Sequence, residues 1–550
     1  MRFPLVSAVA GALAWVALVA TSDGPFAFVS LFLLSPLVLL PLALAHLETR
    51  DRSGRALRLV RLAVIGQPIA AAALVVSFMR PPGSAAALFA GPWLALTVLL
   101  AIHGASRLLA RGAGPPEELL IDAGLVYVAI GGAWLVASRA GISPLGFGEP
   151  TVLLTAIHFH VAAFALPIFA GAAGRAFLPA RGEPAFRIAA IGLVAGPILL
   201  ALGIVLSRRV EVAAAVTLAA SLLLFLAWAS FAAEGAARAV FVALACGALA
   251  SMSAAVFFAS DHTLVDLATM ARFHGAVNAM IVASGLLALL VVRPASGPRG
   301  PRAGAPFSRL RSRARTGPDY FVRQGLVDDA RSPRGLTDDL AAYARDGFDP
   351  EAVDEGVRRF YERTAEYDLR VVPRWSPAFR PFARLYARYA RRAGQMCLPL
   401  EATDDGLLVK SEILGVRDEA DGREGVRAWV RTYADSGEPV YVAAYATHRE
   451  RGVPYMNIAF PFPGWNLTSV LRLDNWRGSG VALTTLATPR TCGDQGVFAV
   501  GHRWHVRLPI DETIAVWRQD EATVAARHTV WVFGARAVEL EYAIVRSDAA

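Results

Sequence analysis

Four polar side chains lie inside long apolar stretches of the sequence, where such groups are costly. His158 and His160 occur in "LLTAIHFHVAAFALPIFAGAAGR", residues 153–175, and His274 and Asn278 occur in "MARFHGAVNAM". Imidazole and amide groups at such places could bind a ligand, relay protons or ligate a metal ion. The alternative is a purely structural role in an interhelical hydrogen bond, which stabilises helix packing by about 0.6 kcal/mol on average. Because two separate stretches carry these groups, the pattern favours a ligand site or pathway.

Helical geometry restricts which of these side chains can meet. Each residue of an α-helix turns about 100°, so His158 and His160 are about 200° apart and point to opposite sides. His274 and Asn278 are four residues apart and share a face. At about 1.5 Å per residue, His158 and His274 each lie about 12 Å from the same membrane surface. We therefore expect the two helices to be neighbours, with His158 the better partner for His274.

Apolar runs that could position these residues fill the first half of the chain. The protein has 550 residues, of which 55% are hydrophobic, and its mean hydropathy is +0.45. This is too apolar for an ordinary soluble protein. A bilayer crossing takes about 20 residues. Ten runs meet this length, at 4–21, 26–46, 59–79, 84–104, 119–138, 150–173, 187–207, 211–232, 237–259 and 266–292. We expect the first run to be a retained helix rather than a cleaved signal peptide.

Arginine is concentrated in the loops that follow the even-numbered runs, notably 47–58, 105–118 and 174–186. Loops rich in Arg and Lys stay in the cytoplasm. The bias therefore predicts a multi-pass protein of the inner (plasma) membrane, with the N-terminus and the entire C-terminal half in the cytoplasm. Within that half, residues 293–318 are expected to form a flexible basic linker. Its seven arginines between 293 and 315 suit contact with anionic lipid, at about 1 kcal/mol each.

The remaining residues change character twice. Residues 319–400 are predicted to be a helical cytoplasmic segment, in which 376–393 form a basic amphipathic helix that lies either on the membrane or on its own domain. From 401 to 550 the apolar residues alternate, which predicts about ten short strands in a barrel or sandwich. The expected architecture is an α-helical polytopic membrane bundle at 1–292 followed by a cytoplasmic α+β domain. The net charge of +9 has no accompanying nucleic-acid motif, so we expect no nucleic-acid partner.

Motifs for several enzyme classes are missing from the sequence. It has no GxSxG elbow, P-loop, HExxH or Rossmann glycine pattern, no ATP-binding signature, and nothing that names a cofactor. The first hypothesis is therefore a secondary transporter of an unknown small molecule with a β-rich ligand-binding or regulatory domain. The second is a membrane-embedded enzyme that uses the same histidines with a metal or haem, and the third is a lipid-sensing membrane protein.

Several longer stretches are similar to one known family. "LTAIHFHVAAFALPIFAG", "ARFHGAVNAM", "FYERTAEYDLRVVPRW", "GQMCLPL" and "MNIAFPFPGWNLTSVLRL" resemble, in the same order, the YndJ-like family of bacterial membrane proteins. The resemblance covers most of the chain. It implies a multi-pass membrane location and a transporter of unassigned substrate, and it points to His158, His160 and His274.

Overall fold

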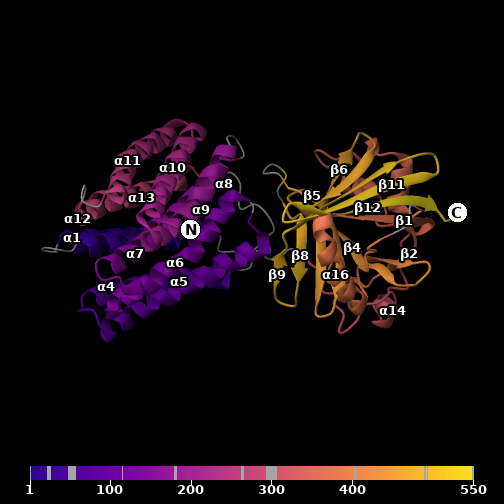
Figure 1. The fold of residues 1–550 in the computed structure, drawn as a ribbon, viewed down its shortest axis with the longest axis horizontal. Helices are drawn as coiled ribbons and strands as arrows, with labels where there is room; N and C mark the ends of the chain where they lie inside the picture. Colours follow the sequence, from indigo (N-terminus) through magenta and orange to yellow (C-terminus); the bar gives the residue numbers. More distant parts are fainter. Residues whose placement is uncertain are drawn as a thin grey trace. The chain divides into compact units, whose positions relative to one another are not determined.

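A computed structural model of the chain describes residues 2–20, 27–47, 57–113, 115–178, 183–261, 266–292, 306–401, 405–487, 491 and 493–547. Half of the basic linker expected at 293–318, residues 293–305, lies outside the described residues, whereas 306–318 are described and include buried side chains such as Ser308 and Thr316. The chain divides into two compact units, Met1–Leu108 with Ala113–Arg299, and Leu109–Gly112 with Gly300–Ala550. The first unit is helical and the second is a β-barrel with short helices (Figure 1).

Ten helical spans of the described chain are long and apolar enough to cross a membrane, which confirms the predicted polytopic bundle. Three of them are each built from two α-helices joined by a π-helical turn. In chain order the spans are α1 (Arg2–Ala20); α2 (Ala27–Leu34), η1 (Ser35–Leu39) and α3 (Leu40–Ala45); α4 (Arg58–Phe78); α5 (Ser84–Arg111); α6 (Pro116–Ala140); α7 (Thr151–His160), η3 (Val161–Ala165) and α8 (Leu166–Phe177); α9 (Glu183–Leu206); α10 (Arg208–Ala232); α11 (Gly235–Ser260); and α12 (Leu267–Met270), η4 (Ala271–Gly275) and α13 (Ala276–Val292). The short 3₁₀-helix η2 (Pro144–Gly146) precedes span six.

The three spans with π-helical turns pack together. In spans two and six, 78% of the apolar window is buried inside the unit, against at most 56% in the others, so these two occupy its centre. The turn η1 contacts η3 and α13, and α8 also contacts α13. Pro36 and Pro167 lie in or beside two of the turns and supply a local cause, because proline lacks the N–H that an α-helical ladder needs. Single π-helical turns occur frequently at functional sites.

A buried ion network joins four spans near the start of α6. Glu118 accepts two hydrogen bonds from Arg175 of α8, at 2.7 and 2.8 Å, and one from Arg107 of α5 at 2.7 Å. Arg107 also donates to Asp122 at 2.5 Å, and Arg175 donates to the backbone carbonyl of His46 in span two at 3.3 Å. Glu118 and Asp122 are fully buried. Asp122 is therefore part of an enclosed ion network.

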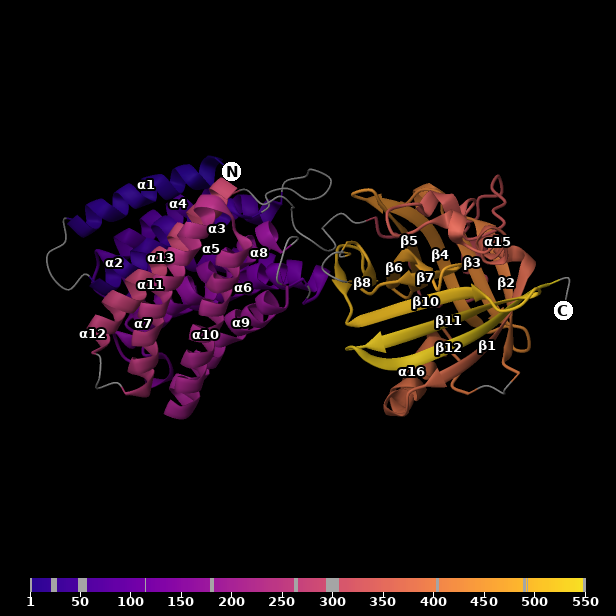
Figure 2. The same ribbon diagram turned by 90° about the horizontal axis from the view of Figure 1, so that it is seen from above.

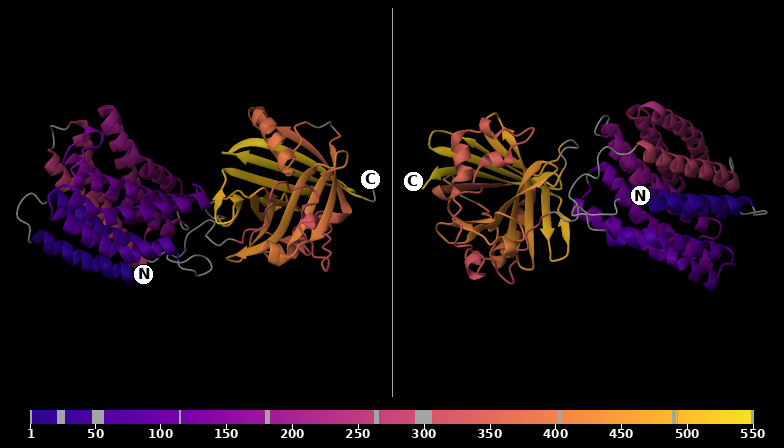
Figure 3. Two further views of the ribbon diagram at one scale, coloured as in Figure 1. Left: turned by 90° about the horizontal axis from the view of Figure 1, so that it is seen from below. Right: turned by 180° about the vertical axis from the view of Figure 1, so that it is seen from behind.

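Ten antiparallel strands of the second unit close into a barrel (Figures 2 and 3). The order around it is β5-β4-β3-β2-β1-β12-β11-β10-β7-β6, and β6 pairs back to β5, while β8 and β9 extend from β6. Of the two predicted architectures, the barrel is therefore observed. The strands are β1 (Tyr367–Trp375), β2 (Leu407–Gly415), β3 (Arg427–Tyr433), β4 (Pro439–Glu450), β5 (Val453–Phe462), β6 (Trp465–Trp476), β7 (Gly480–Thr484), β8 (Gly496–Val500), β9 (His505–Arg507), β10 (Ile510–Arg518), β11 (Thr523–Val532) and β12 (Ala535–Arg546).

The segment 319–400 differs from the helical expectation, because it contains the strand β1. This strand pairs with β12 along its whole length, but with β2 only from Leu369 to Val371. Pro373 lies beyond the β2 pairing, at a position where its missing N–H costs no second ladder bond. The helices of this unit are α14 (Tyr320–Arg323), η5 (Leu340–Tyr343), η6 (Pro350–Ala352), α15 (Glu355–Glu362), η7 (Thr364–Glu366), η8 (Pro377–Phe379), α16 (Arg380–Ala393) and α17 (Asp418–Asp421).

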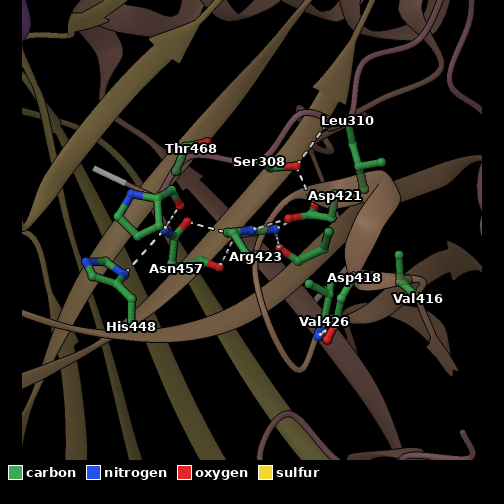
Figure 4. A network of polar contacts seen from close by, with 12 residues as sticks. Ser308, Leu310, Val416, Asp418, Asp421, Arg423, Val426, His448, Asn457 and Thr468 are labelled. Carbon is green, nitrogen blue, oxygen red and sulfur yellow. Dashed lines mark hydrogen bonds and ion pairs between the residues drawn. The ribbon is translucent and has the colours of Figure 1, made fainter. Parts of the chain in front are cut away.

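A buried polar network fixes the first described residues of this unit to the barrel wall (Figure 4). Arg423 binds Asp421 through two hydrogen bonds, at 2.6 and 2.9 Å, and donates to the side-chain and backbone oxygens of Asn457 at 2.8 and 2.7 Å. Ser308 donates to Asp421 at 2.6 Å, and Asn457 donates to the carbonyl of Pro306 at 2.9 Å. Since the charges are paired and hydrogen-bonded within the network, we assign it a structural role.

Candidate functional site

A cavity of about 710 Å³ lies within the helical unit. Spans six to ten contribute most of its wall, which is largely apolar. This volume is within the range of about 300–1,000 Å³ that is typical of ligand pockets. The polar side chains that line it are Thr151, Thr155, His158, Glu211, His274 and Asn278. Three of the four polar residues singled out from the sequence therefore face one space.

His158 lines this cavity and has one unsatisfied ring nitrogen. The side chain is partly exposed to it, but its Nε2 atom is buried and has no hydrogen-bond partner among the described residues. A buried polar atom without a partner costs free energy, and more so in an apolar medium. A ligand or water in the cavity would remove this cost.

His274 and Asn278 are held in place by Ser251 of the neighbouring helix α11. His274 Nδ1 lies 3.1 Å from the backbone oxygen of Ser251 and 3.1 Å from Asn278 Nδ2. Asn278 Nδ2 donates to Ser251 Oγ at 2.5 Å and to the backbone oxygen of His274 at 2.8 Å. Its Oδ1 atom is buried and lacks a partner in the described part of the chain. Asn278, which lines the cavity, therefore has an unsatisfied hydrogen-bond acceptor.

His160 has entirely different surroundings, as its spacing from His158 predicts. It is fully buried, accepts a hydrogen bond from the indole nitrogen of Trp93 at 2.9 Å, and places Nδ1 2.7 Å from the backbone oxygen of Ala156. Its ring also packs edge-on against Phe32. A Cβ atom at Gly131 would come within 2.7 Å of this imidazole, so the glycine allows the close approach. With both nitrogens satisfied, His160 has the environment of a packing residue.

Two threonines and one glutamate of the cavity were missed by the sequence reasoning. Thr151, Thr155 and His158 are spaced i, i+4 and i+7, so they form one polar stripe along α7. The sequence contains this spacing, but threonine is common in apolar helices and therefore gives no distinctive signal of a site. Glu211 lies in the first turn of α10, and only the tertiary structure brings it to the same cavity.

Hydrogen-bond acceptors on the residues that line the cavity include the amide oxygen of Asn278 and the side-chain oxygens of Glu211. Such a set recognises a molecule that carries hydrogen-bond donors. Within the described residues no group of three His, Cys, Asp or Glu side chains is arranged to hold a metal ion. The metal- or haem-dependent alternative stays a sequence prediction.

Ten apolar spans joined to a closed barrel define a multi-pass membrane protein with a separate β-domain. The model of the family described as YndJ-like protein matches residues 30–282. The "Uncharacterized membrane protein YndJ" of Bacillus subtilis (strain 168) is 31% identical over 484 residues, which covers 87% of this chain and 86% of that protein. The chain therefore belongs to the YndJ-like family, and no solved structure matches it.

Proposed function

We propose that the helical unit is a transport pathway for a small organic molecule that carries hydrogen-bond donors. The observation that supports this most is the shared cavity of His158, His274 and Asn278, with two buried polar atoms that lack partners among the described residues. Polar groups inside a membrane are retained where they line a substrate route or pair with each other. In secondary transporters, substrate sites lie near the membrane midplane and are typically formed by interrupted helices.

The proposal also covers the orientation of the protein in the membrane and the role of the barrel. The arginine-rich loops support a cytoplasmic position for the barrel, where it would act as a ligand-binding or regulatory domain of the transporter. The protein itself is proposed to lie in the bacterial inner membrane.

Two adjacent alanines of η3 provide a matched test of the pathway. Ala162 lines the cavity, whereas Ala163 is fully buried. Each is changed to cysteine in a chain whose own three cysteines, Cys246, Cys397 and Cys492, are replaced by serine. A membrane-impermeant maleimide is then applied separately to each face of oriented vesicles. We expect Ala162→Cys to react from both faces and Ala163→Cys to resist from both.

Each outcome of this labelling bears on the proposal. Reaction of Ala162→Cys from both faces supports alternating access, because a transport site opens to each side in turn. Reaction from one face only contradicts transport and leaves a receptor-like pocket. Equal reaction of the two variants contradicts the cavity itself. Thermal unfolding of both variants checks that the substitutions leave the fold intact.

A second candidate function, lipid sensing, is favoured by the helix α16 on the outside of the barrel (Figure 2). Phe382 and Leu385 are 62% and 64% exposed, and Tyr389 is 44% exposed. These residues are spaced along one side of the helix, while Ala383 and Ala390 are buried on the other. The same helix carries five arginines and no acidic residue: Arg380, Arg384, Arg388, Arg391 and Arg392. An exposed apolar stripe beside positive charge suits the surface of an anionic bilayer.

The lipid contact is testable in nanodiscs that hold the full chain. Hydrogen exchange of α16 should slow in discs with anionic phosphatidylglycerol, compared with discs of phosphatidylcholine alone, and added salt should reverse the change. The double variant Arg384→Glu and Arg388→Glu should abolish this lipid dependence. Arg536→Glu changes an arginine on the barrel that is also largely exposed and serves as the control. Identical exchange in both lipids would exclude α16 as a lipid contact.

A further inference from the structure

The interior of the barrel holds a second cavity, of about 70 Å³, that differs chemically from the first. Aromatic and aliphatic side chains form most of its wall, including Phe360 and Tyr361 of α15. Three polar atoms of its lining residues are buried and have no hydrogen-bond partner in the described chain: Nε1 of Trp429, Nε of Arg431 and Oε1 of Glu512. Three such atoms around one space indicate that something in the cavity binds them.

Arg431 supplies a positive charge that has no carboxylate partner. Its guanidinium carbon lies 3.9 Å from the ring centre of Trp429 and 4.2 Å from that of Tyr441. Tyr542 is a hydrogen-bonding neighbour, and none of the ion pairs of the described residues includes Arg431. The residue is only 8% exposed. A buried guanidinium without a direct ion-pair contact is costly, so the site favours a negatively charged ligand group beside Arg431 and the Trp429 N–H.

Glu512 supplies an acceptor on another strand of the same cavity. Its Oε2 atom lies 2.7 Å from His528 Nε2. Burial opposes ionisation, but the interaction with His528 and a hydrogen bond from Ser469 outweigh it, and the pKa of Glu512 is lowered. The carboxylate is therefore ionised at neutral pH, and Oε1 can accept from a ligand donor.

We propose that this cavity binds a short carboxylate with an adjacent hydrogen-bond donor, that is, a small hydroxy- or amino-carboxylate. The carboxylate accepts from Trp429 and Arg431, and the hydroxyl or ammonium group donates to Glu512. The cavity has about half the volume of one of about 150 Å³ that holds benzene, so the ligand must be smaller than benzene. Burial keeps the tyrosines of the wall neutral, since it raises the pKa of Tyr445 to about 12.

This inference deepens the ligand-binding role proposed for the barrel and is independent of the membrane cavity. The test is calorimetric titration of the full chain in nanodiscs with three probes: acetate, glycolate and glycine. Glycolate or glycine should bind at least about tenfold more tightly than acetate, which lacks the donor for Glu512. Preference for glycolate identifies a hydroxyl donor, and preference for glycine identifies an ammonium donor.

Four variants locate the binding site. Trp429→Phe keeps an aromatic ring over Arg431 but removes the N–H, and it should weaken binding by about tenfold. Arg431→Gln should abolish measurable binding. Trp517→Phe and Arg527→Gln change a tryptophan and an arginine of the same barrel outside this cavity, and they should leave the affinity unchanged.

Three results would overturn the inference. One is the absence of binding for all three probes, and the second is equal binding in Trp429→Phe and wild type. The third is an experimental density map that shows only ordered water between Trp429, Arg431 and Glu512. Loss of binding in Arg431→Gln counts only if its thermal unfolding matches that of wild type, whereas Trp429→Phe is conservative enough to test the site alone. Failure here leaves the labelling of Ala162→Cys unaffected, so the two proposals fail separately.

Discussion

The two cavities of this protein differ in volume and in the kind of buried polar group that they contain. The membrane cavity is about ten times larger, 710 against 70 Å³, and histidine and asparagine provide its central polar groups. The barrel cavity is small and contains the full charges of Arg431 and Glu512. An uncompensated charge is costlier in hydrocarbon than a neutral polar group. In the barrel, aromatic walls surround these charges and His528 is hydrogen-bonded to Glu512.

One group of buried charges in the helical unit is instead paired and lies near the ends of spans. The network of Glu118 with Arg107 and Arg175 ties three spans together by direct ion pairs. The same contrast separates His158 from His160, which are two residues apart. One faces the cavity with a free nitrogen, and the other is fully hydrogen-bonded. Position in the packed bundle, and not residue type, decides which histidine is available for function.

The largest expected effect comes from Glu118→Ala. The substitution leaves two buried guanidinium groups without their shared carboxylate, which should destabilise the helical unit by about 3–5 kcal/mol. Glu183→Ala is the matched control, because Glu183 also lies in the first turn of a span but forms an exposed i, i+4 pair with Arg187. It should cost less than about 1 kcal/mol. Equilibrium unfolding in detergent micelles measures both, and equal losses would show that the network carries little energy.

His160→Ala should be the next most damaging change. It removes a fully buried ring and leaves the Trp93 indole N–H without an acceptor, at a cost of about 2–4 kcal/mol. His158→Ala should cost less than about 1 kcal/mol, because this side chain already faces open space. The same unfolding experiment compares the two. A larger loss for His158→Ala would reverse the assignment of packing and cavity roles.

Glu512→Gln should act on the barrel in a pH-dependent way. Because the folded-state pKa of Glu512 is lowered, its ionisation stabilises the fold above the ordinary value of 4.5, and this contribution disappears as the pH falls through the folded-state pKa. The variant should be less stable by about 1.5–3 kcal/mol at neutral pH, and the difference should shrink in acid. Thermal unfolding across a pH series measures this. Glu541→Gln, at a partly exposed carboxylate, should show a much smaller difference, and an unchanged gap in acid for Glu512→Gln would contradict the mechanism.

Trp93→Phe should have the smallest effect. The change retains most of the ring and removes one hydrogen bond to His160, which is worth about 1 kcal/mol. Trp134→Phe changes a partly exposed tryptophan that lines the membrane cavity and should be close to neutral. Unfolding midpoints of the two variants provide the measurement, and no difference between them would mean that the indole hydrogen bond adds nothing.

The sequence by itself determined much of the architecture. Ten long apolar runs leave little choice but a membrane bundle, since backbone groups in lipid must be satisfied within each helix. Strict alternation after residue 401 indicated strands, because side chains alternate between the two faces of a sheet. The i+2 spacing of His158 and His160 was enough to separate their environments, as a property of one helix. The strand β1 was not predicted, because its sequence "YDLRVVPRW" contains charged residues and a proline.

Only the tertiary structure decided which polar groups meet. The contact between Ser251 and Asn278, the placement of Glu211 beside the cavity, and the cluster of Trp429, Arg431 and Glu512 all join residues from different helices or strands. No local pattern encodes these contacts, because each depends on how several elements pack and on the register between strands. The same reason applies to Asp122 of the buried ion network. Its partner Arg107 lies on another helix, and burial of the pair is a property of the packed bundle.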